Sequence, residues 1–337
     1  MSLLRRLVAS QLGADRAGWL LDGLDVHPAL LEPGPEDDAS RAVVAQALGI
    51  LLLDDILYRV PTATAYMDDR VGGGSRVHLD HGAVRTVAGV GCGGLPEGQE
   101  SVTRLLSPLG YRQRETHDLG RLRMTGRSWC HQDLPGDIPQ YFVSELHADR
   151  FSEPFRAATR RVLSSSRDPL TENGKGALAH LAAHGMLPRQ RAESLLGELV
   201  PCFGRQHGVP SLADYEALLA ESDEMAWIAT EGTAFNHASD RVADVVAVAG
   251  AERAAGRPIK DGVEVSASGR VLQTAHRAAV VDRTFKAEDG SLVTRSVPGS
   301  FFELISRHPL PDGSGIDLGF DAANAQEIFT MTRPATP

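Results

Sequence analysis

The fold is decided by two stretches that lie far apart in the chain, HLDHGAVRTV (residues 78–87) and TEGTAFNHASDR (residues 230–241). Each stretch contains a histidine in or just before a strand-like run, His81 in the first and His237 in the second. Each is followed by a helix-like run that ends at a glycine, where a helix is expected to stop. Three further strand-like runs come after each helix.

The two segments therefore share one order of elements, strand, helix, strand, strand, strand, although their sequences barely resemble each other. The first has runs at residues 84–90, 100–109, 111–115, 121–128 and 141–147. The second has runs at residues 233–242, 243–255, 263–267, 271–285 and 300–307. An internal duplication of this kind predicts an α+β protein, in which two βαβββ modules form a curved mixed sheet.

Helix-like patterns occupy the remaining parts of the chain. Apolar residues recur at intervals of three and four over residues 2–24 and 39–58, and a third helical stretch covers residues 155–219 with breaks at proline and glycine. We expect one catalytic domain made of four parts. These are N-terminal helices (1–60), the first module (61–154), a helical insert (155–222) and the second module (223–337).

Composition limits the function classes. Acidic residues outnumber basic ones by 44 to 34, so a phosphate-binding surface for nucleic acid is not expected. The three cysteines are far apart and form no CxxC pair, which argues against a disulfide framework or a thiolate metal site and fits a reducing cytoplasm. No apolar run is long enough for a signal peptide or a membrane span. We expect a cytoplasmic protein without a membrane or nucleic-acid partner; the sequence does not indicate an oligomeric state.

Glu303 is the most informative single residue. In the strand-like run FFELISR (residues 301–307) it shares a face with Phe301 and Ile305 under the period-two rule. Burial of an ionised carboxylate is costly unless a cation or several donors meet it, so a metal ion or an arginine is expected there. The alternative is an edge strand whose glutamate faces water.

His237 lies in a run of small and polar residues that is poorly suited to a plain core strand. A neutral imidazole at this position would be a good ligand for a divalent first-row metal, and Asn236 could orient the groups beside it. The alternative is a core histidine bonded to the backbone. His81 occupies the mirrored position in the first half of the chain, which favours the metal interpretation for both.

Strand alternation places His81 on one face with Leu79 and Arg85, whereas Asp80 falls on the other face. His81 and Arg85 can then point into one cavity without competing for the same ion. An arginine on an apolar face either pairs with a buried carboxylate of the protein or receives a carboxylate of a ligand. We favour the ligand.

Two histidines and one carboxylate suit iron(II) and leave three coordination positions for a chelating substrate and dioxygen. Zinc with the same ligands is an alternative that would suggest hydrolysis. Glu145, in YFVSELH, takes the place in the first half that Glu303 has in the second, so it is a candidate for a supporting carboxylate behind the ligands or for a fourth ligand. Gln273 could contact a ligand, and His276 is expected either to be structural or to support a ligand from behind.

Six segments together resemble the 2-oxoadipate dioxygenase/decarboxylase family, also called hydroxyglutarate synthases. They are HLDHGAVRTV, YRQRETHDLGRLRMTGRSW, QYFVSELH, TEGTAFNHASDRV, VLQTAHRAAVV and PGSFFELISR. The resemblance runs from Leu52 to Phe329. That family is similar in architecture to the vicinal oxygen chelate enzymes, whose paired modules have the element order described above.

The resemblance implies that His81, His237 and Glu303 bind Fe(II) and that Arg85 grips the substrate carboxylate. It implies a reaction of 2-oxoadipate with dioxygen that yields 2-hydroxyglutarate and carbon dioxide. The partners would then be a small-molecule 2-oxo acid and O2. One departure concerns the C-terminal segment GFDAANAQEIF (residues 319–329), which is similar to the shorter members of the family and leaves the substrate side chain open.

Two other functions are compatible with the same scaffold. A related dioxygenase could act on another 2-oxo acid, aromatic or aliphatic, although the aromatic content of 5% and the presence of Arg85 favour a dicarboxylic substrate. Paired modules of this type also serve as non-catalytic small-molecule-binding proteins. The three potential metal ligands favour an enzyme.

Overall fold

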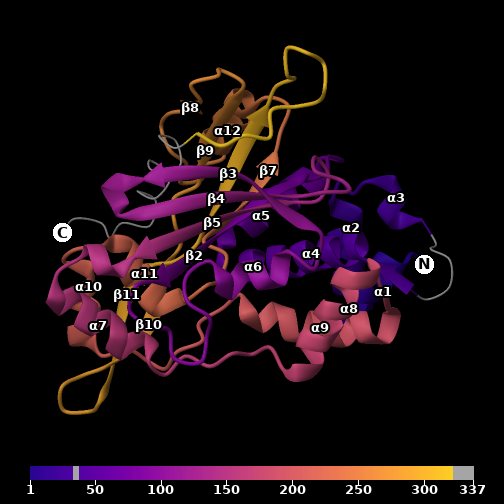
Figure 1. Cartoon of the computed structure of the whole chain (residues 1–337). Helices are drawn as coiled ribbons and strands as arrows, with labels where there is room; N and C mark the ends of the chain where they lie inside the picture. The colour runs from indigo at the N-terminus through magenta and orange to yellow at the C-terminus, as the bar shows by residue number, and fades with distance from the viewer. Residues whose placement is uncertain (33–37, 322–337) are drawn as a thin grey trace.

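The computed structural model describes residues 1–32 and 38–321. Its centre is a curved eight-stranded mixed sheet in the order β3-β4-β5-β2-β7-β12-β9-β8 (Figure 1). The strands are β2 (Leu79–Ala88), β3 (Tyr111–Leu119), β4 (Met124–His131), β5 (Gln140–His147), β7 (His237–Arg241), β8 (Glu264–Val265), β9 (Val271–Ala275) and β12 (Phe301–Arg307). The predicted α+β class and curved mixed sheet are confirmed.

The predicted order of elements is confirmed in both modules. The first module runs β2, α6 (Glu100–Leu106), β3, β4, β5, and the second supplies β7, α12 (Val245–Ala254), β8, β9 and β12 to the same sheet. In each module the first strand pairs in parallel with the last, β2 with β5 and β7 with β12. The modules meet where β2 and β7 pair antiparallel at the middle of the sheet.

The register of β2 and β7 relates the two modules by a local two-fold axis. His81 pairs with Ser239, Gly82 with Ala238, and Ala83 with His237. Exchanging the two modules converts the first of these pairs into the third. The axis therefore passes through the middle pair, between Gly82 and Ala238. Position 81 therefore corresponds to position 237, and both histidines lie at the centre of the sheet.

The predicted single strand over residues 271–285 is wrong. Strand β9 ends at Ala275, and the chain then forms a separate two-stranded hairpin from β10 (Val280–Lys286) and β11 (Leu292–Pro298). Phe285 of this hairpin packs on Tyr215 outside the main sheet. Both pieces have the residue pattern of strands, so the sequence does not mark where the chain leaves one sheet for another.

The N-terminal part is helical: α1 (Leu3–Leu12), α2 (Ala14–Gly23), α3 (Pro28–Leu31), α4 (Arg41–Arg59) and α5 (Pro61–Gly72). The helix predicted over residues 2–24 is divided at Gly13, whose φ of 82° favours glycine and ends α1. Helix α4 is apolar around most of its circumference and is buried between the other helices and the sheet. One apolar cluster joins these helices with the outer face of the sheet, from Leu3 to Leu304.

The helices of the insert lie on both sides of the sheet. Helices α8 (Glu172–His184) and α9 (Arg189–Cys202) pack beside the N-terminal helices (Figure 1). The short strands β1 (Asp38–Ser40) and β6 (Met186–Pro188) pair antiparallel and connect the two parts. Helices α7 (Glu153–Leu163), α10 (Leu212–Leu219) and α11 (Asp223–Glu231) lie at the other side. The second apolar cluster joins them to the inner face of the sheet, with Phe155 and Trp227 in the same cluster as Ala83 and Phe301.

Candidate metal centre

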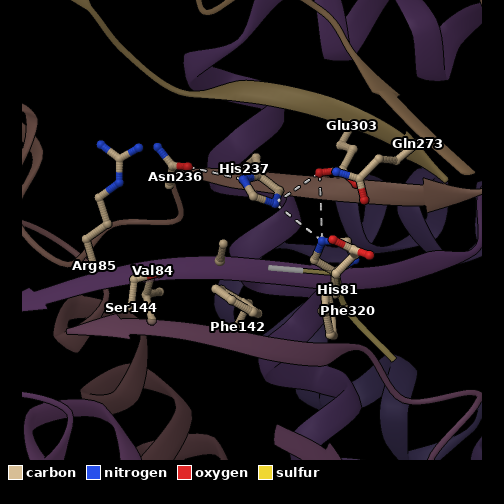
Figure 2. Close-up of a pocket in the computed structure, with 12 residues that line it drawn as sticks. His81, Val84, Arg85, Phe142, Ser144, Asn236, His237, Gln273, Glu303 and Phe320 are labelled. Atoms are coloured by element: carbon tan, nitrogen blue, oxygen red, sulfur yellow. Dashed lines mark hydrogen bonds and ion pairs between the residues drawn. The ribbon is translucent and has the colours of Figure 1, made fainter. Parts of the chain in front are cut away.

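Three buried side chains from three adjacent strands converge on the inner face of the sheet. His81 comes from β2, His237 from β7 and Glu303 from β12, and their nearest donor atoms all lie within 4.8 Å of one another. The His81 and His237 Nε2 atoms are 3.3 Å apart, and Glu303 Oε2 lies 3.3 Å from the second and 3.9 Å from the first (Figure 2). In the part of the chain that the structure describes, this is the one cluster with the composition of a metal site.

The spacing of these atoms fits a single divalent cation. Nitrogen and oxygen ligands bind such ions at about 2.0–2.2 Å, so adjacent ligands of one ion are roughly 3 Å apart. The Glu303 side chain is 2% exposed and its Oε1 atom has no hydrogen-bond partner. A buried carboxylate oxygen without a partner is costly unless a cation meets it.

Electrostatics support the same conclusion. Burial raises the pKa of the Glu303 carboxyl well above its ordinary value, and the nearby carboxylates of Glu264 and Asp80 raise it further. Burial also lowers the pKa of His237 well below its usual value, with the neighbouring His81 and the positive charge of Arg85 adding to this fall, and burial lowers the pKa of His81 as well. The imidazoles are thus neutral and able to bind a metal, and a cation would release the proton from Glu303.

Each histidine is oriented through its second ring nitrogen. His81 Nδ1 lies 2.9 Å from Asp80 Oδ1, and His237 Nδ1 lies 3.1 Å from Asn236 Oδ1. Such partners would hold each ring so that Nε2 points at a metal ion bound between the three side chains. The Ser239 hydroxyl also lies within 3.1 Å of His81 Nε2.

Asp80 corrects one detail of the expected strand alternation. The pairing of β2 with β7 shifts register between Leu79 and His81, so Asp80 is an additional residue in β2. Leu79 therefore packs in the outer cluster beside the N-terminal helices and does not share the inner face with His81. At this irregularity the Asp80 carboxylate approaches the imidazole ring of His81.

The three candidate ligands open onto a cavity with about 460 Å³ of empty space, a volume that includes open solvent at its mouth. Its lining includes the other predicted site residues Arg85, Asn236 and Gln273, together with Phe142 and Phe320. Gln273 donates from Nε2 to Glu264 at 3.2 Å, which orients its amide at the cavity wall.

Arg85 is the cationic group of this cavity. Its guanidinium lies over the ring of Trp227 at 4.9 Å, and the residue is 1% exposed. Burial lowers its pKa to about 10, with the carboxylates of Glu224 and Asp223 opposing the fall, so it stays charged at neutral pH. Arg85 also borders a neighbouring cavity of about 390 Å³.

The expectation that Glu145 stands where Glu303 stands is wrong. Ala83 pairs with Phe142 in the first module, and its symmetry mate Ser239 pairs with Glu303 in the second, so Phe142 is the true counterpart of Glu303. Glu145 lies outside the cavity lining, where it accepts hydrogen bonds from the backbone N–H of Gln99 and from Arg127. The equivalence of two residues in these strands depends on how the backbones pair. The sequences around Glu145 and Glu303 are similar, but they do not show this register.

His276, for which the sequence allowed a structural role or a supporting role behind a ligand, lies away from the cavity. Its Nε2 atom lies 2.8 Å from Glu252 Oε2, and its ring packs near Tyr66 and Phe302 beneath the sheet. It is absent from the cavity lining.

Sequence reasoning missed three residues that shape the centre. Asp80 supports His81, Arg307 binds Asp80, and Phe320 packs its ring at 5.0 Å against His81. The one signal for Asp80 in the sequence is that it precedes His81 as Asn236 precedes His237, but this position alone does not show that its carboxylate reaches the ring. Residues 322–329 of the C-terminal motif lie outside the described residues.

No helix among the described residues combines the length and the apolar character needed to cross a membrane.

Comparison with known proteins identifies a family. Residues 61–329 match the model of the family described as 2-oxoadipate dioxygenase/decarboxylase. Two curated plant proteins carry that name. The one from Oryza sativa subsp. japonica is 24% identical over 332 residues, which cover 90% of this chain and 82% of the rice protein. The one from Arabidopsis thaliana is 26% identical over 215 residues, and the match spans 58% of this chain and about half of the relative, 51%.

Solved structures show the same fold. A protein of Ralstonia eutropha JMP134, described as a member of the glyoxalase superfamily, is 51% identical to this chain. Its TM-score is 0.90, and the match covers 95% of this chain and 98% of that one. The hydroxyglutarate synthase of Oryza sativa, solved in complex with 2-oxoadipate, is 22% identical, with a TM-score of 0.66 over 90% of this chain and 96% of the other.

Proposed function

Because the chain belongs to the 2-oxoadipate dioxygenase/decarboxylase family, we propose that it converts 2-oxoadipate and dioxygen into 2-hydroxyglutarate and carbon dioxide, with Fe(II) held by His81, His237 and Glu303. The equation balances with these four species. The observation that carries the proposal is the convergence of two neutral imidazoles and one buried carboxylate beside a cavity that also contains a buried arginine.

The donor set favours iron(II) over a structural ion. When bound, iron(II) supplies a redox-active centre with open positions for a chelating 2-oxo acid and for dioxygen. The protein supplies three donors from one side only, because all three residues lie on adjacent strands of a single sheet. The opposite side of the donor set faces the cavity (Figure 2).

The other residues would bind and orient the substrate. Arg85 is charged and held over Trp227, so it can receive a carboxylate in a bidentate manner without a large loss of side-chain freedom. The aromatic side chains Phe142 and Phe320 would exclude water from the keto group and its neighbouring carboxylate. A dicarboxylic 2-oxo acid satisfies both ends of this arrangement, one end at the donor set and the other at Arg85.

A second candidate is an oxygenase of an aromatic 2-oxo acid on the same scaffold. The observation that favours it is the aromatic wall formed by Phe142 and Phe320. The charged Arg85 in the same cavity favours the dicarboxylic substrate, since a second carboxylate can pair with its guanidinium and an aromatic tail cannot. A non-catalytic binding protein would not need the three convergent donors.

Oxygen uptake by Fe(II)-loaded protein tests the proposal. We expect uptake with 2-oxoadipate, release of one equivalent of carbon dioxide and formation of 2-hydroxyglutarate. Phenylpyruvate and 4-hydroxyphenylpyruvate should support little uptake. Preference for these aromatic acids would favour the second candidate, and no uptake with any 2-oxo acid would refute the oxygenase.

Substitution of the ligands tests the site separately from the substrate. His81→Ala, His237→Ala and Glu303→Ala should each lose stoichiometric metal and turnover. Glu145→Ala is the matched control, because it removes a carboxylate from the same sheet outside the cavity. It should keep one equivalent of metal; loss of metal from the control alone would contradict the assignment.

We also propose that the protein is cytoplasmic. Cys92, Cys130 and Cys202 are free thiols in the structure, which fits a reducing compartment. Fractionation of cells that express the full chain would test it.

A further inference from the structure

The two histidines at the centre occupy equivalent positions, but their hydrogen-bond partners do not carry the same charge. The two-fold relation between the modules takes His81 to His237. Residues 80 and 236, which directly precede the two histidines, correspond to each other in the sequence, although residue 80 is the additional residue of β2. Residue 80 is an aspartate and residue 236 is an asparagine. Each places a side-chain oxygen on the Nδ1 atom of the following histidine, at 2.9 Å and 3.1 Å respectively.

The charge at Asp80 is compensated on the side away from the cavity. Its carboxylate accepts from Arg307 Nε and Nη2 at 2.9 Å and from Arg241 Nε at 2.6 Å. Asp80 and Arg307 are fully buried together, and Asp80 does not line the cavity. A carboxylate that accepts from an imidazole N–H increases the electron density at the other ring nitrogen, so His81 gains strength as a metal ligand.

Asn236 is placed differently. It lines the cavity, and in the view of Figure 2 its amide lies between the Arg85 guanidinium and the His237 ring. If His237 binds the metal through Nε2, its Nδ1 atom carries the proton and requires an acceptor, which must be Asn236 Oδ1. The NH2 group is then directed away from His237. This Nδ2 atom is buried, in a residue that is 3% exposed, and has no hydrogen-bond partner.

A buried amide N–H group without a partner is costly, and one that borders a cavity is satisfied when a ligand supplies an acceptor. An aspartate at position 236 would support His237 as Asp80 supports His81, but it would offer no donor. It would also add a negative charge to the cavity that a 2-oxo acid enters as an anion.

We propose that the two equivalent positions have divided their roles: Asp80 strengthens the metal site through His81, whereas Asn236 orients His237 and donates its Nδ2–H to an anionic oxygen of the 2-oxo acid. The inference rests on the proposed function. It makes Asp80 a positioning residue and Asn236 a substrate-contacting residue.

The test uses the isosteric exchanges Asp80→Asn and Asn236→Asp, each a control for the other. Mn(II) serves as the metal probe, because free Mn(II) is counted directly by its electron paramagnetic resonance signal. Binding of 2-oxoadipate to the Mn(II)-saturated protein is measured by calorimetry. Neither measurement depends on turnover.

We expect a separation of the two effects. Asp80→Asn should weaken Mn(II) binding by roughly 10- to 100-fold, as loss of such a partner usually does, and should leave the 2-oxoadipate affinity of the saturated protein nearly unchanged. Asn236→Asp should retain or strengthen Mn(II) binding and weaken 2-oxoadipate binding by roughly tenfold or more. The double exchange should show both defects.

Wild-type protein that binds no Mn(II) would refute the proposed function itself. Wild-type protein that binds one equivalent, with an Asn236→Asp variant that keeps full 2-oxoadipate affinity, would refute only the division of roles. Equal loss of Mn(II) in both variants would also refute it. Should Asp80→Asn fail to fold because Arg241 and Arg307 lose their partner, Asn236→Asp alone still decides the assignment of the donor.

Discussion

At the scale of single residues, burial decides which titratable groups hold a charge. His207 is 6% exposed, and its Nε2 atom bonds to the carbonyl of Ala229 in α11 at 2.9 Å. Burial lowers the pKa of this histidine from 6.5 to about 4. The folded protein therefore keeps His207 neutral under conditions in which the unfolded chain is protonated.

This difference in the pKa of His207 predicts the direction in which the stability of the protein changes with pH. Between the two pKa values the unfolded state binds more protons, so stability is full above pH 6.5 and falls as the pH approaches 4. Between pH 7 and pH 5 the contribution of His207 should fall by about 2 kcal/mol. Urea unfolding of metal-free wild-type and His207→Gln protein at both pH values measures it. The variant should lose less stability on acidification; an identical loss in both proteins would show that His207 does not contribute.

Residue identity was also the level at which the sequence was most informative about the site. Glu303 on an apolar strand face and two mirrored histidines were sufficient to propose the donor set, because burial of these groups requires a partner. Asp80 was not found, because alternation assigns it to the opposite face and only the shift of register in β2 brings its carboxylate to His81.

At the scale of elements, the antiparallel pair β2 and β7 sets the geometry of the centre. Gly82 lies at its midpoint, directly beneath the ring of Phe235. A Cβ atom on Gly82 would come within 2.2 Å of that ring, which is much closer than van der Waals contact. Glycine is required here so that the two modules can approach closely.

Gly82→Ala should therefore destabilise the protein by about 1–3 kcal/mol, as overpacking of a rigid core usually does. It should also weaken metal binding, because His81 and His237 belong to the two displaced strands. Gly250→Ala in α12 is the control, since a Cβ atom there meets nothing within 4 Å and alanine favours helix. Denaturant titrations compare the two. Equal unfolding midpoints for Gly82→Ala and wild type would show that the ring moves away without cost.

At the scale of the whole molecule, the N-terminal helices and the sheet share one core. The outer apolar cluster includes Leu4 of α1, many residues of α4 and Leu304 of β12. Arg59 at the end of α4 donates to the carbonyl of Phe235, two residues before His237. The helices thus support the strands that carry the candidate ligands.

A chain that begins at residue 61 should fail to fold cooperatively, because removal of α1 to α4 would expose the outer face of the sheet. Circular dichroism and calorimetric melting of residues 61–337 should show no sharp transition. Addition of residues 1–60 as a separate chain should restore one. A cooperative transition for residues 61–337 alone, close to that of the full chain, would identify the N-terminal helices as an independent unit.

The sequence by itself determined the duplicated element order and the α+β class, because both depend on local periodicity, and it singled out three candidate donors through the cost of burying a polar group. Tertiary structure alone decided that Phe142 and not Glu145 is the counterpart of Glu303, that β10 leaves the main sheet, and that Asp80 reaches His81. These features depend on backbone register and on contacts between residues distant in the chain. A shift of one residue in register turns a side chain to the other face, and no local pattern records such a shift.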